Sequence, residues 1–205
     1  MSEWKLFDGE RATVSTAEFH TYRARAPHLE QWAHQGRLYL AHEFVLDAVS
    51  RMSHTPVVVS DLGCGDGGLL QLLAASDTVF AYGYDFQPSN AVGWAERNVT
   101  ARPVNVFDSE EIINPEVDLG QIVVMTEVLE HLTRPHSVLH EISTRGVTHF
   151  VVASSPWTES DVSHDECHAW AWDQAGYRAL FEDACFTVVR HETTGMFQVI
   201  LAEVR

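Results

Sequence analysis

A glycine-rich turn between a strand and a helix is the feature that most constrains the fold of this chain. The β-branched run at residues 57–62 leads directly into Gly63, Gly65, Gly67 and Gly68. Such a run is typical of a buried parallel strand. Glycines at a strand-to-helix turn allow a tight bend and let a ligand approach the backbone closely. The sequence therefore predicts an α/β fold with a ligand-binding turn at the end of its first core strand.

Strand-like and helix-like segments alternate through the rest of the chain. We expect strands at residues 57–62, 78–84, 103–107, 121–126 and 147–153, and helices at residues 67–75, 88–98, 135–144 and 173–183. Residues 186–192 and 197–203 should form an antiparallel pair around Thr194-Gly195. Repeated strand–helix units predict a mostly parallel sheet covered by helices on both faces. The expected fold is a Rossmann-like, doubly wound α/β fold, with a seven-stranded sheet and an antiparallel C-terminal hairpin.

Two helices are expected before this core, at residues 16–25 and 29–52, with a break at Pro27 because a proline steers the preceding residue away from helix. A chain of 205 residues suits one domain. We expect residues 1–52 to form the N-terminal part of that domain and residues 56–205 its Rossmann-like core.

The charge balance limits the partners of the chain. It has 29 acidic and 13 basic residues, a formal net charge of −16. Binding to a polyphosphate backbone depends on Lys and Arg, so a nucleic-acid partner is disfavoured. No apolar run approaches membrane-spanning length, and residues 1–10 do not read as a secretory signal. The three cysteines are scattered, which predicts reduced thiols and a cytoplasmic protein.

Asp85 lies about 20 residues beyond the glycine turn, at the end of the second expected strand. A carboxylate at this separation can accept hydrogen bonds from ribose hydroxyls, although Asp85 could also cap the helix after Pro88. The turn lacks the Lys-Ser/Thr pair of a P-loop. Gly63, Gly65 and Gly68 do fit the spacing of a dinucleotide-binding loop, so a nicotinamide-dependent oxidoreductase stays open on spacing alone.

With these motifs in order, the chain resembles the class I S-adenosylmethionine-dependent methyltransferases over about residues 56–155. Three acidic motifs of that family are matched by Asp61 with Gly63, Gly65 and Gly67, by Asp85, and by Asp108. The segment from Thr126 to Leu132, which contains Glu-Val-Leu-Glu-His, resembles a branch that includes ubiquinone-biosynthesis-type O-methyltransferases. One departure is Ser143-Thr144-Arg145-Gly146, which stands where the family has Lys-Pro-Gly-Gly and would shorten a loop.

The resemblance implies S-adenosylmethionine as the cofactor, an N-terminal helical lid over that cofactor and a role for each matching residue. Gly63 and Gly65 would face its methionine part and ribose, and Asp85 the ribose hydroxyls. Phe86 would pack on adenine and Asp108 would contact the adenine amino group; the alternatives are a core phenylalanine and a loop cap. The cofactor-binding residues implied are Asp61, Gly63, Gly65, Gly67, Asp85, Phe86, Asp108 and Glu127.

Methyl transfer needs an aligned nucleophile and, where necessary, a base that removes its proton. The catalytic candidates at the ends of the fourth and fifth strands are Glu130, His131 and His168, with His164 as a further candidate base. Trp157, Tyr22 and Arg23 are candidates for the substrate site, and Tyr22 or Arg23 could instead face the cofactor carboxylate or belong to an ordinary packing helix. The chain lacks the Asp/Asn-Pro-Pro-aromatic motif of many amino-group methyltransferases and a Pro-Cys nucleophile. We expect O- or N-methylation of a small molecule or glycan, with no metal assigned.

Two further interpretations remain. Glu127, Glu130, His131 and His168 also resemble the ligands of metal-dependent 2′-O-methyltransferases that act on the 3′ ends of small RNAs, where Mn, Mg or Zn would lower the pKa of the attacked hydroxyl. A non-catalytic scaffold that keeps the cofactor fold is the other, although it would predict damaged glycines or a lost Asp85, and both are intact. Fold alone does not decide between these functions.

Overall fold

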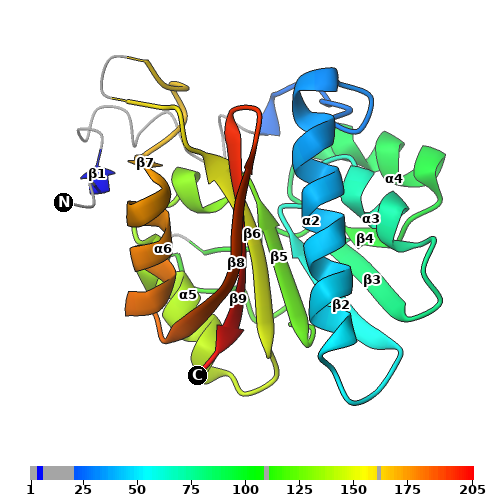
Figure 1. Ribbon diagram of the computed structural model, residues 1–205. Helices are drawn as coiled ribbons and strands as arrows, with labels where there is room; N and C mark the ends of the chain where they lie inside the picture. Colours follow the sequence, from blue (N-terminus) through cyan, green and yellow to red (C-terminus); the bar gives the residue numbers. More distant parts are fainter. Residues whose placement is uncertain (1–3, 7–20, 109–110, 161–162) are drawn as a thin grey trace.

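A computed structural model describes residues 4–6, 21–108, 111–160 and 163–205 and contains a seven-stranded sheet with helices on both faces (Figure 1). Its strands are β2 (Val57–Leu62), β3 (Val79–Tyr84), β4 (Ala101–Arg102), β5 (Ile122–Thr126), β6 (Phe150–Pro156), β8 (Phe186–Thr194) and β9 (Phe197–Val204). They lie in the order β4-β3-β2-β5-β6-β9-β8. β2 to β6 pair in parallel, whereas β9 is antiparallel to both β6 and β8. The expected Rossmann-like sheet with an antiparallel C-terminal hairpin is confirmed.

Helices cover both faces of this sheet because its central strands bury both sets of alternating side chains. The helices are α2 (Trp32–Ser50), α3 (Gly68–Leu73), α4 (Ala91–Arg97), α5 (Pro135–Thr144) and α6 (Gln174–Asp183), with short 3₁₀ turns η1 (Pro88–Asn90) and η2 (Leu129–His131). The apolar sides of α2 and α3 pack on one face of the sheet, and those of α5 and α6 pack on the other. Two apolar cores therefore fix the sheet between the helices.

The third expected strand is the main correction within the core. The sequence predicts a strand at residues 103–107, but the strand that pairs with β3 is β4, which ends at Arg102. Pro103 has no N–H to donate to the sheet, and the N–H of Val104 turns back to the Arg102 carbonyl (2.9 Å). The chain therefore leaves the sheet edge at Pro103.

The N-terminal segment also differs from its expected form. Of the helix predicted at residues 16–25, residues 16–20 lie outside the described residues, and residues 23–25 are not helical. Residues 28–30 form a turn, so the second helix begins at Trp32 in place of residue 29. Residues 23–28 thus reach the core as an extended strap, several of whose side chains line the cavity described below.

A small second sheet was not expected from the sequence. β1 (Trp4–Leu6) pairs antiparallel with β7 (Trp170–Trp172), which connects β6 to α6. This pairing places β1, near the beginning of the given sequence, next to β7, which follows the parallel strands in the chain. None of the helices in the described part of the chain has the length and apolar character that a bilayer crossing requires.

Candidate active site

One large cavity, about 950 Å³ in volume, opens at the carboxyl ends of the parallel strands. Ligands of open α/β sheets bind at this edge. Ten of the residues singled out in the sequence line it: Arg23, Asp61, Gly63, Gly65, Asp85, Phe86, Asp108, Glu127, His131 and His168. Motifs spread over 146 residues of sequence therefore meet in one cavity.

Gly63 and Gly65 of the glycine turn line the cavity, and both have the positive φ of a left-handed backbone conformation. A side chain at Gly63 (φ +76°) would collide with Val128, whose Cγ2 lies 2.7 Å from the Cβ position. Gly65 (φ +53°) has no atom within 4 Å of its Cβ position. The space beside Gly65 is therefore open for a ligand to pass over the backbone.

Asp85 is held in place beside this turn by three donors. Its Oδ2 accepts from the Gly65 N–H (3.0 Å), and its Oδ1 accepts from the Gln87 N–H (2.8 Å) and from Asn90 Nδ2 (3.1 Å). Burial raises the pKa of Asp85, while these hydrogen bonds oppose the increase. The carboxylate is thus oriented before any ligand arrives, and its remaining lone pairs face the cavity that it lines.

Asp61 and Arg37 form a buried pair of opposite charges on the other side of the turn. Burial and the neighbouring Asp85 raise the pKa of Asp61 to about 7, and the Arg37 guanidinium opposes that increase. Asp61 Oδ1 and Arg37 Nε have no hydrogen-bond partner among the described residues, although both side chains are only 1% exposed. Buried polar atoms without partners are costly unless a ligand satisfies them. Both residues line the cavity.

Arg37 was not among the sequence-based site residues, yet its position in α2 carries a signal. It lies four residues before Ala41 and eight before Val45, on the helix face that packs against the sheet. A charged side chain on a buried helix face needs a partner. Here the Arg37 NH2 donates to His28 Nδ1 (3.2 Å), and burial with the adjacent cation lowers the pKa of His28 to about 3, which keeps His28 neutral.

Glu127 adopts a strained backbone conformation at the end of β5, with φ at +61°. Such conformations cost about 1–3 kcal/mol in non-glycine residues and cluster at functional sites. Its Oε1 accepts from Ser154 Oγ (3.2 Å) and lies 3.9 Å from Arg37 NH1. Burial raises the pKa of Glu127, and the Arg37 charge opposes the increase.

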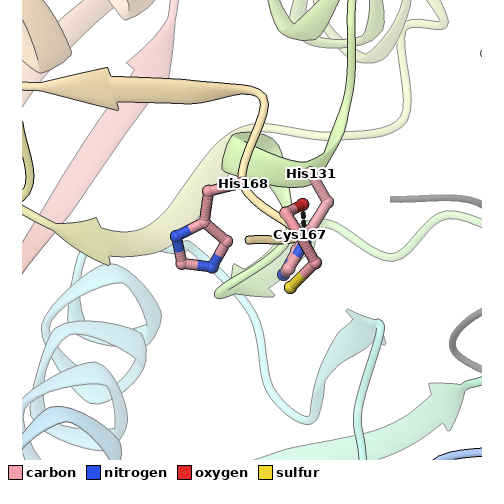
Figure 2. A group of neighbouring side chains, drawn as sticks. All are labelled: His131, Cys167 and His168. Atoms are coloured by element: carbon pink, nitrogen blue, oxygen red, sulfur yellow. Dashed lines mark hydrogen bonds between the residues drawn. The ribbon is translucent and has the colours of Figure 1, made fainter. Parts of the chain in front are cut away.

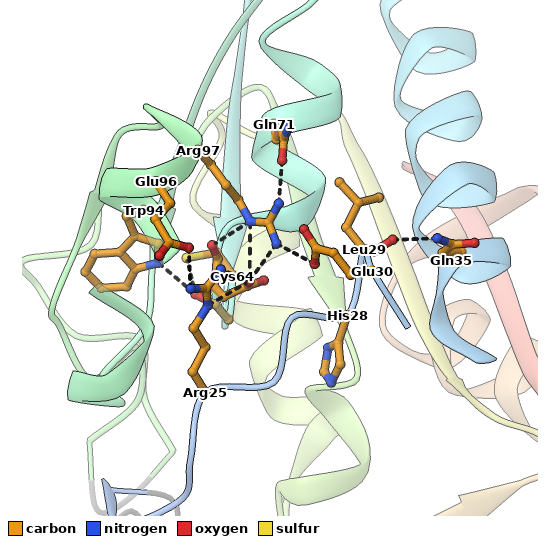
Figure 3. A network of polar contacts seen from close by, with 12 residues as sticks. Arg25, His28, Leu29, Glu30, Gln35, Cys64, Gln71, Trp94, Glu96 and Arg97 are labelled. Carbon is orange, nitrogen blue, oxygen red and sulfur yellow. Dashed lines mark hydrogen bonds and ion pairs between the residues drawn. The ribbon is translucent and has the colours of Figure 1, made fainter. Parts of the chain in front are cut away.

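An ionic network fastens the N-terminal strap to the glycine turn (Figure 3). The buried Asp66 carboxylate accepts from Arg97 NH2 (2.7 Å) and from Arg25 NH2 (3.1 Å). Arg97 also pairs with Glu30 (2.7 Å), and Arg25 pairs with Glu96. Because Arg25 belongs to the strap and Glu30 to the turn that follows it, the network holds residues 25–30 beside the glycine turn.

His131, Cys167 and His168 meet at the end of the cavity nearest Glu127 (Figure 2). Two hydrogen bonds tie η2 to the segment before β7: His131 Nδ1 donates to the Cys167 carbonyl (3.0 Å), and the Ala169 N–H donates to the Glu130 carbonyl (2.7 Å). His168 Nδ1 lies 2.8 Å from Glu159 Oε2. Cys167 and Glu159 are further residues that the sequence-based selection missed, since their roles depend on loop geometry.

Other predicted residues lie outside the cavity lining. Glu130 is fully buried behind it, and burial with the Glu127 charge raises the pKa of Glu130 well above its usual range. Tyr22 is 83% exposed, and Trp157 donates its Nε1–H to the Gly195 carbonyl (3.2 Å). Gly67 (φ +84°) precedes α3, where a Cβ would lie 2.8 Å from Val99 Cγ2. His164 is likewise not part of the lining.

The four metal ligands implied by the RNA-methyltransferase resemblance do not come together as one set. Among the described residues, the group whose ligand atoms lie within 4.8 Å of one another consists of His131, Cys167 and His168. Glu127 is directed to Ser154 and Arg37. The two histidines therefore cluster with a cysteine and without the glutamates.

Comparison with known proteins now bears on what this cavity binds. A protein family described as "Methyltransferase domain" matches residues 28–191, most of the chain. The chain belongs to this family. Its sheet, helices and cavity are accordingly those of a class I methyltransferase, and S-adenosylmethionine is its cofactor. A comparison with curated proteins finds no match.

Several solved structures share the fold of this methyltransferase at low identity. Magnesium protoporphyrin IX methyltransferase from Synechocystis PCC 6803 with bound cofactor has a TM-score of 0.61 at 16% identity, over 96% of this chain and 95% of its own. A methyltransferase from Aquifex aeolicus has a TM-score of 0.58 at 18% identity, over 80% and 89%. The [4+2]-cyclase SpnF has a TM-score of 0.62 at 12% identity, over 88% and 85%. A cyclase among these neighbours illustrates that the fold does not specify the reaction.

The cavity of this methyltransferase fits its cofactor. The unpartnered atoms of Asp61 and Arg37 match the ammonium and carboxylate of an amino acid, and Asp85 is oriented for a pair of hydroxyls. The open space beside Gly65 lets the cofactor pass between these two groups.

Proposed function

We propose that this methyltransferase transfers a methyl group to a hydroxyl or amino group of a small molecule or glycan. The observation that carries the proposal is the cluster of histidines and acids that lines the same cavity as the glycine turn and Asp85. S-adenosylmethionine supplies the methyl group as an electrophilic sulfonium carbon when it is bound. The chain's own residues then have three tasks: to hold the cofactor, to align the acceptor and to take up its proton.

The proposed cofactor contacts follow the cavity from one end to the other. Asp85 accepts hydrogen bonds from the ribose, and Phe86 packs against the adenine. Asp108 contacts the adenine amino group, although in the structure its Oδ1 also accepts from the Ile112 N–H (2.9 Å) and so caps a turn. The sequence-based roles of these three residues stand as proposals, supported by their shared position in the lining.

Recognition of the methionine part is assigned to charges inside the fold. Arg37 is proposed to bind the carboxylate, and Asp61 with Glu127 to bind the ammonium group. Arg37 is preferred to Tyr22 for this role because Tyr22 lies outside the lining, while Arg37 lines the cavity and its buried Nε has no hydrogen-bond partner among the described residues. Arg23 lines the cavity and stays a candidate for the substrate site. A buried guanidinium is well suited to a carboxylate because it forms two parallel hydrogen bonds.

Cofactor binding is expected to tighten as the pH rises through 7. Asp61 in the empty cavity has a pKa of about 7, so its neutral form predominates at pH 6, whereas the cofactor ammonium favours the carboxylate. Calorimetric titration should therefore give a Kd about tenfold lower at pH 8 than at pH 6. Asp61→Asn should bind weakly at both values.

The same raised pKa destabilises the cofactor-free fold at high pH. A carboxyl whose folded-state pKa lies above its unfolded value contributes most stability at low pH and loses that contribution as the pH passes the folded-state pKa. Asp61→Asn should therefore raise the Tm of the cofactor-free protein more at pH 8 than at pH 6. An equal pH dependence of the Kd in wild type and variant would contradict the assignment.

At the proposed acceptor end of the cavity, two histidines that can act as bases lie among acidic side chains. Both histidines have Nδ1 directed to an oxygen, and Nε2 is therefore the ring nitrogen proposed to take up the proton of the acceptor. Glu130 precedes His131 in η2 and is buried outside the cavity lining. Glu127, Glu159 and Asp165 lie around the same end of the cavity. These acids, together with the net charge of −16, disfavour a phosphate-bearing acceptor.

The acceptor class can be tested without knowing the natural substrate. Formation of S-adenosylhomocysteine would be measured with a panel of neutral hydroxyl and amine compounds, simple glycosides and a single-stranded RNA oligonucleotide. We expect turnover with members of the small-molecule panel and none above background with RNA. Preferential turnover of the RNA would overturn the proposed acceptor class while leaving the methyltransferase activity itself intact.

The proposed location is cytoplasmic. The three cysteines are free, and two of them, Cys64 and Cys167, are buried in the walls of the cavity. Free thiols within a binding site support a reducing compartment.

A further inference from the structure

Three side chains with metal-binding atoms converge at the acceptor end of the cavity (Figure 2). One ligand atom each from His131, Cys167 and His168 lies within 4.8 Å of the others. The Cys167 and His168 side chains are buried, with 1% and 7% of their surface exposed. The cluster is therefore a built feature of the interior and not a chance grouping of surface residues.

Both histidines are oriented as metal ligands usually are. His131 Nδ1 donates to the Cys167 carbonyl, and His168 Nδ1 donates to the Glu159 carboxylate. These hydrogen bonds place the proton of each ring on Nδ1, which makes Nε2 the nitrogen that can donate a lone pair to a cation. A carboxylate or carbonyl behind the distal ring nitrogen is the usual support of a metal-binding histidine, because it fixes the tautomer and the orientation of the ring.

The electrostatic surroundings favour a cation. Glu127, Glu159 and Asp165 line the same part of the cavity, and the Cys167 thiol donates to Asp165 Oδ1 (2.9 Å). One cationic side chain also lies beside the cluster, because Arg23 NH1 is 3.8 Å from Cys167 Sγ. Arg23 is exposed, so its side chain can move away without breaking the packing of the core.

We propose that His131 Nε2, Cys167 Sγ and His168 Nε2 bind a zinc-type divalent cation that activates a hydroxyl acceptor. The assignment rests on the proposed function, because it makes this end of the cavity the acceptor end. Thiolate and imidazole together favour Zn²⁺, and three protein ligands leave a fourth tetrahedral position open. An alcohol or sugar hydroxyl bound in the cavity would take that position. The acceptor class is thereby narrowed from hydroxyl or amine to hydroxyl.

The proposed methyl transfer requires no reactant besides S-adenosylmethionine, the hydroxyl acceptor and the bound ion. On ion binding the Cys167 thiol releases one proton to solvent, and the backbone N–H of Cys167 continues to hold Asp165 (3.0 Å). The coordinated hydroxyl loses its proton to solvent more readily than a free hydroxyl. Its oxygen forms the new bond to the methyl carbon while the carbon–sulfur bond breaks, and the sulfur keeps the electron pair. Without the ion, one of the two Nε2 atoms would take up the hydroxyl proton.

The test is a titration of metal-free, full-length protein with Co²⁺ and Zn²⁺. Co²⁺ reports a thiolate ligand through a sulfur-to-metal charge-transfer band, and Zn²⁺ affinity follows from competition with a chromogenic chelator. We expect one ion per chain with that band. Cys167→Ser and His168→Gln should lower the affinity by roughly 10- to 100-fold, and Glu159→Gln should lower it by a smaller factor through loss of ring orientation. Cys185→Ser and His140→Gln, which alter an exposed cysteine and an exposed histidine, should bind as wild type does.

The results of this titration test the ion site independently of the proposed methyl transfer. Absence of one-to-one binding, or equal binding by wild type and Cys167→Ser, would overturn the ion site even if methyl transfer is found. Binding with the expected variant pattern would support it even before an acceptor is known. With a hydroxyl acceptor in hand, removal of the ion should lower kcat and leave the Kd of S-adenosylmethionine unchanged, whereas faster turnover of the metal-free enzyme would contradict the assigned role.

Discussion

Replacing His168 with alanine is expected to lower kcat by roughly 100- to 10,000-fold, because the change removes the Nε2 atom that holds the proposed ion or, in the metal-free enzyme, takes up the acceptor proton. His168 lies in the cavity wall with Nδ1 bound to Glu159, so its Nε2 is the atom best fixed toward the acceptor. The Kd of S-adenosylmethionine should stay close to the wild-type value, because the proposed cofactor contacts lie on Asp61, Asp85 and Arg37. Initial rates with an acceptor from the panel and calorimetric cofactor binding measure the two effects separately.

Two companion variants sharpen that expectation. Glu159→Gln keeps the hydrogen bond but removes its charge, so a smaller loss of kcat is expected than for His168→Ala. His140→Ala changes an exposed histidine on α5 and should leave kcat unaltered. A His168→Ala enzyme with wild-type kcat would remove His168 from the reaction. A rise in the cofactor Kd with unchanged kcat would place His168 in cofactor binding instead.

Asp85→Asn is expected to weaken S-adenosylmethionine binding by roughly 100- to 1,000-fold. The carboxylate accepts from the Gly65 and Gln87 N–H groups and from Asn90 Nδ2. An amide has only one accepting oxygen, so its NH₂ group must face one of those donors and cannot accept from the ribose as a carboxylate does. Lost ribose contacts and a displaced glycine turn both reduce affinity.

The fold of the variant needs its own measurement because Asp85 is part of the turn. Thermal unfolding without cofactor should show a Tm decrease, since one buried donor loses its acceptor. Asp108→Asn is the matched control at the adenine end, where the side chain is exposed and a smaller loss of affinity is expected. An Asp85→Asn protein that binds the cofactor as wild type does would exclude Asp85 from the ribose site.

Much of this architecture follows from local sequence patterns. The β-branched runs that form β2 and β5 favour strands, and Thr194-Gly195 favours a turn. Tertiary context did not override these local preferences. The glycine turn and Asp85 were recognisable because their chemistry requires short, fixed spacings. Local patterns failed at Pro103, where the missing N–H ends the edge strand, and at residues 23–25, whose contacts with Asp66 and Glu96 depend on distant segments.

The site was less predictable than the fold for the same reason. Glu130 and His131 are neighbours in the Glu-Val-Leu-Glu-His segment, but η2 turns His131 toward the cavity and buries Glu130 behind it. Arg37 lies within a helix that the sequence indicates mainly as packing. Cys167 meets His131 only because the segment before β7 folds back onto η2. Such meetings are set by tertiary structure, which residue spacing alone does not encode.

The most direct test of the whole account is calorimetric titration of the wild-type protein with S-adenosylmethionine at pH 8, beside Asp85→Asn and His168→Ala. We expect one binding site per chain in wild type and in His168→Ala, and an affinity for S-adenosylmethionine reduced by at least about 100-fold in Asp85→Asn. Absence of binding in the wild type, or equal binding in all three proteins, would contradict the assignment of this cavity as the cofactor site.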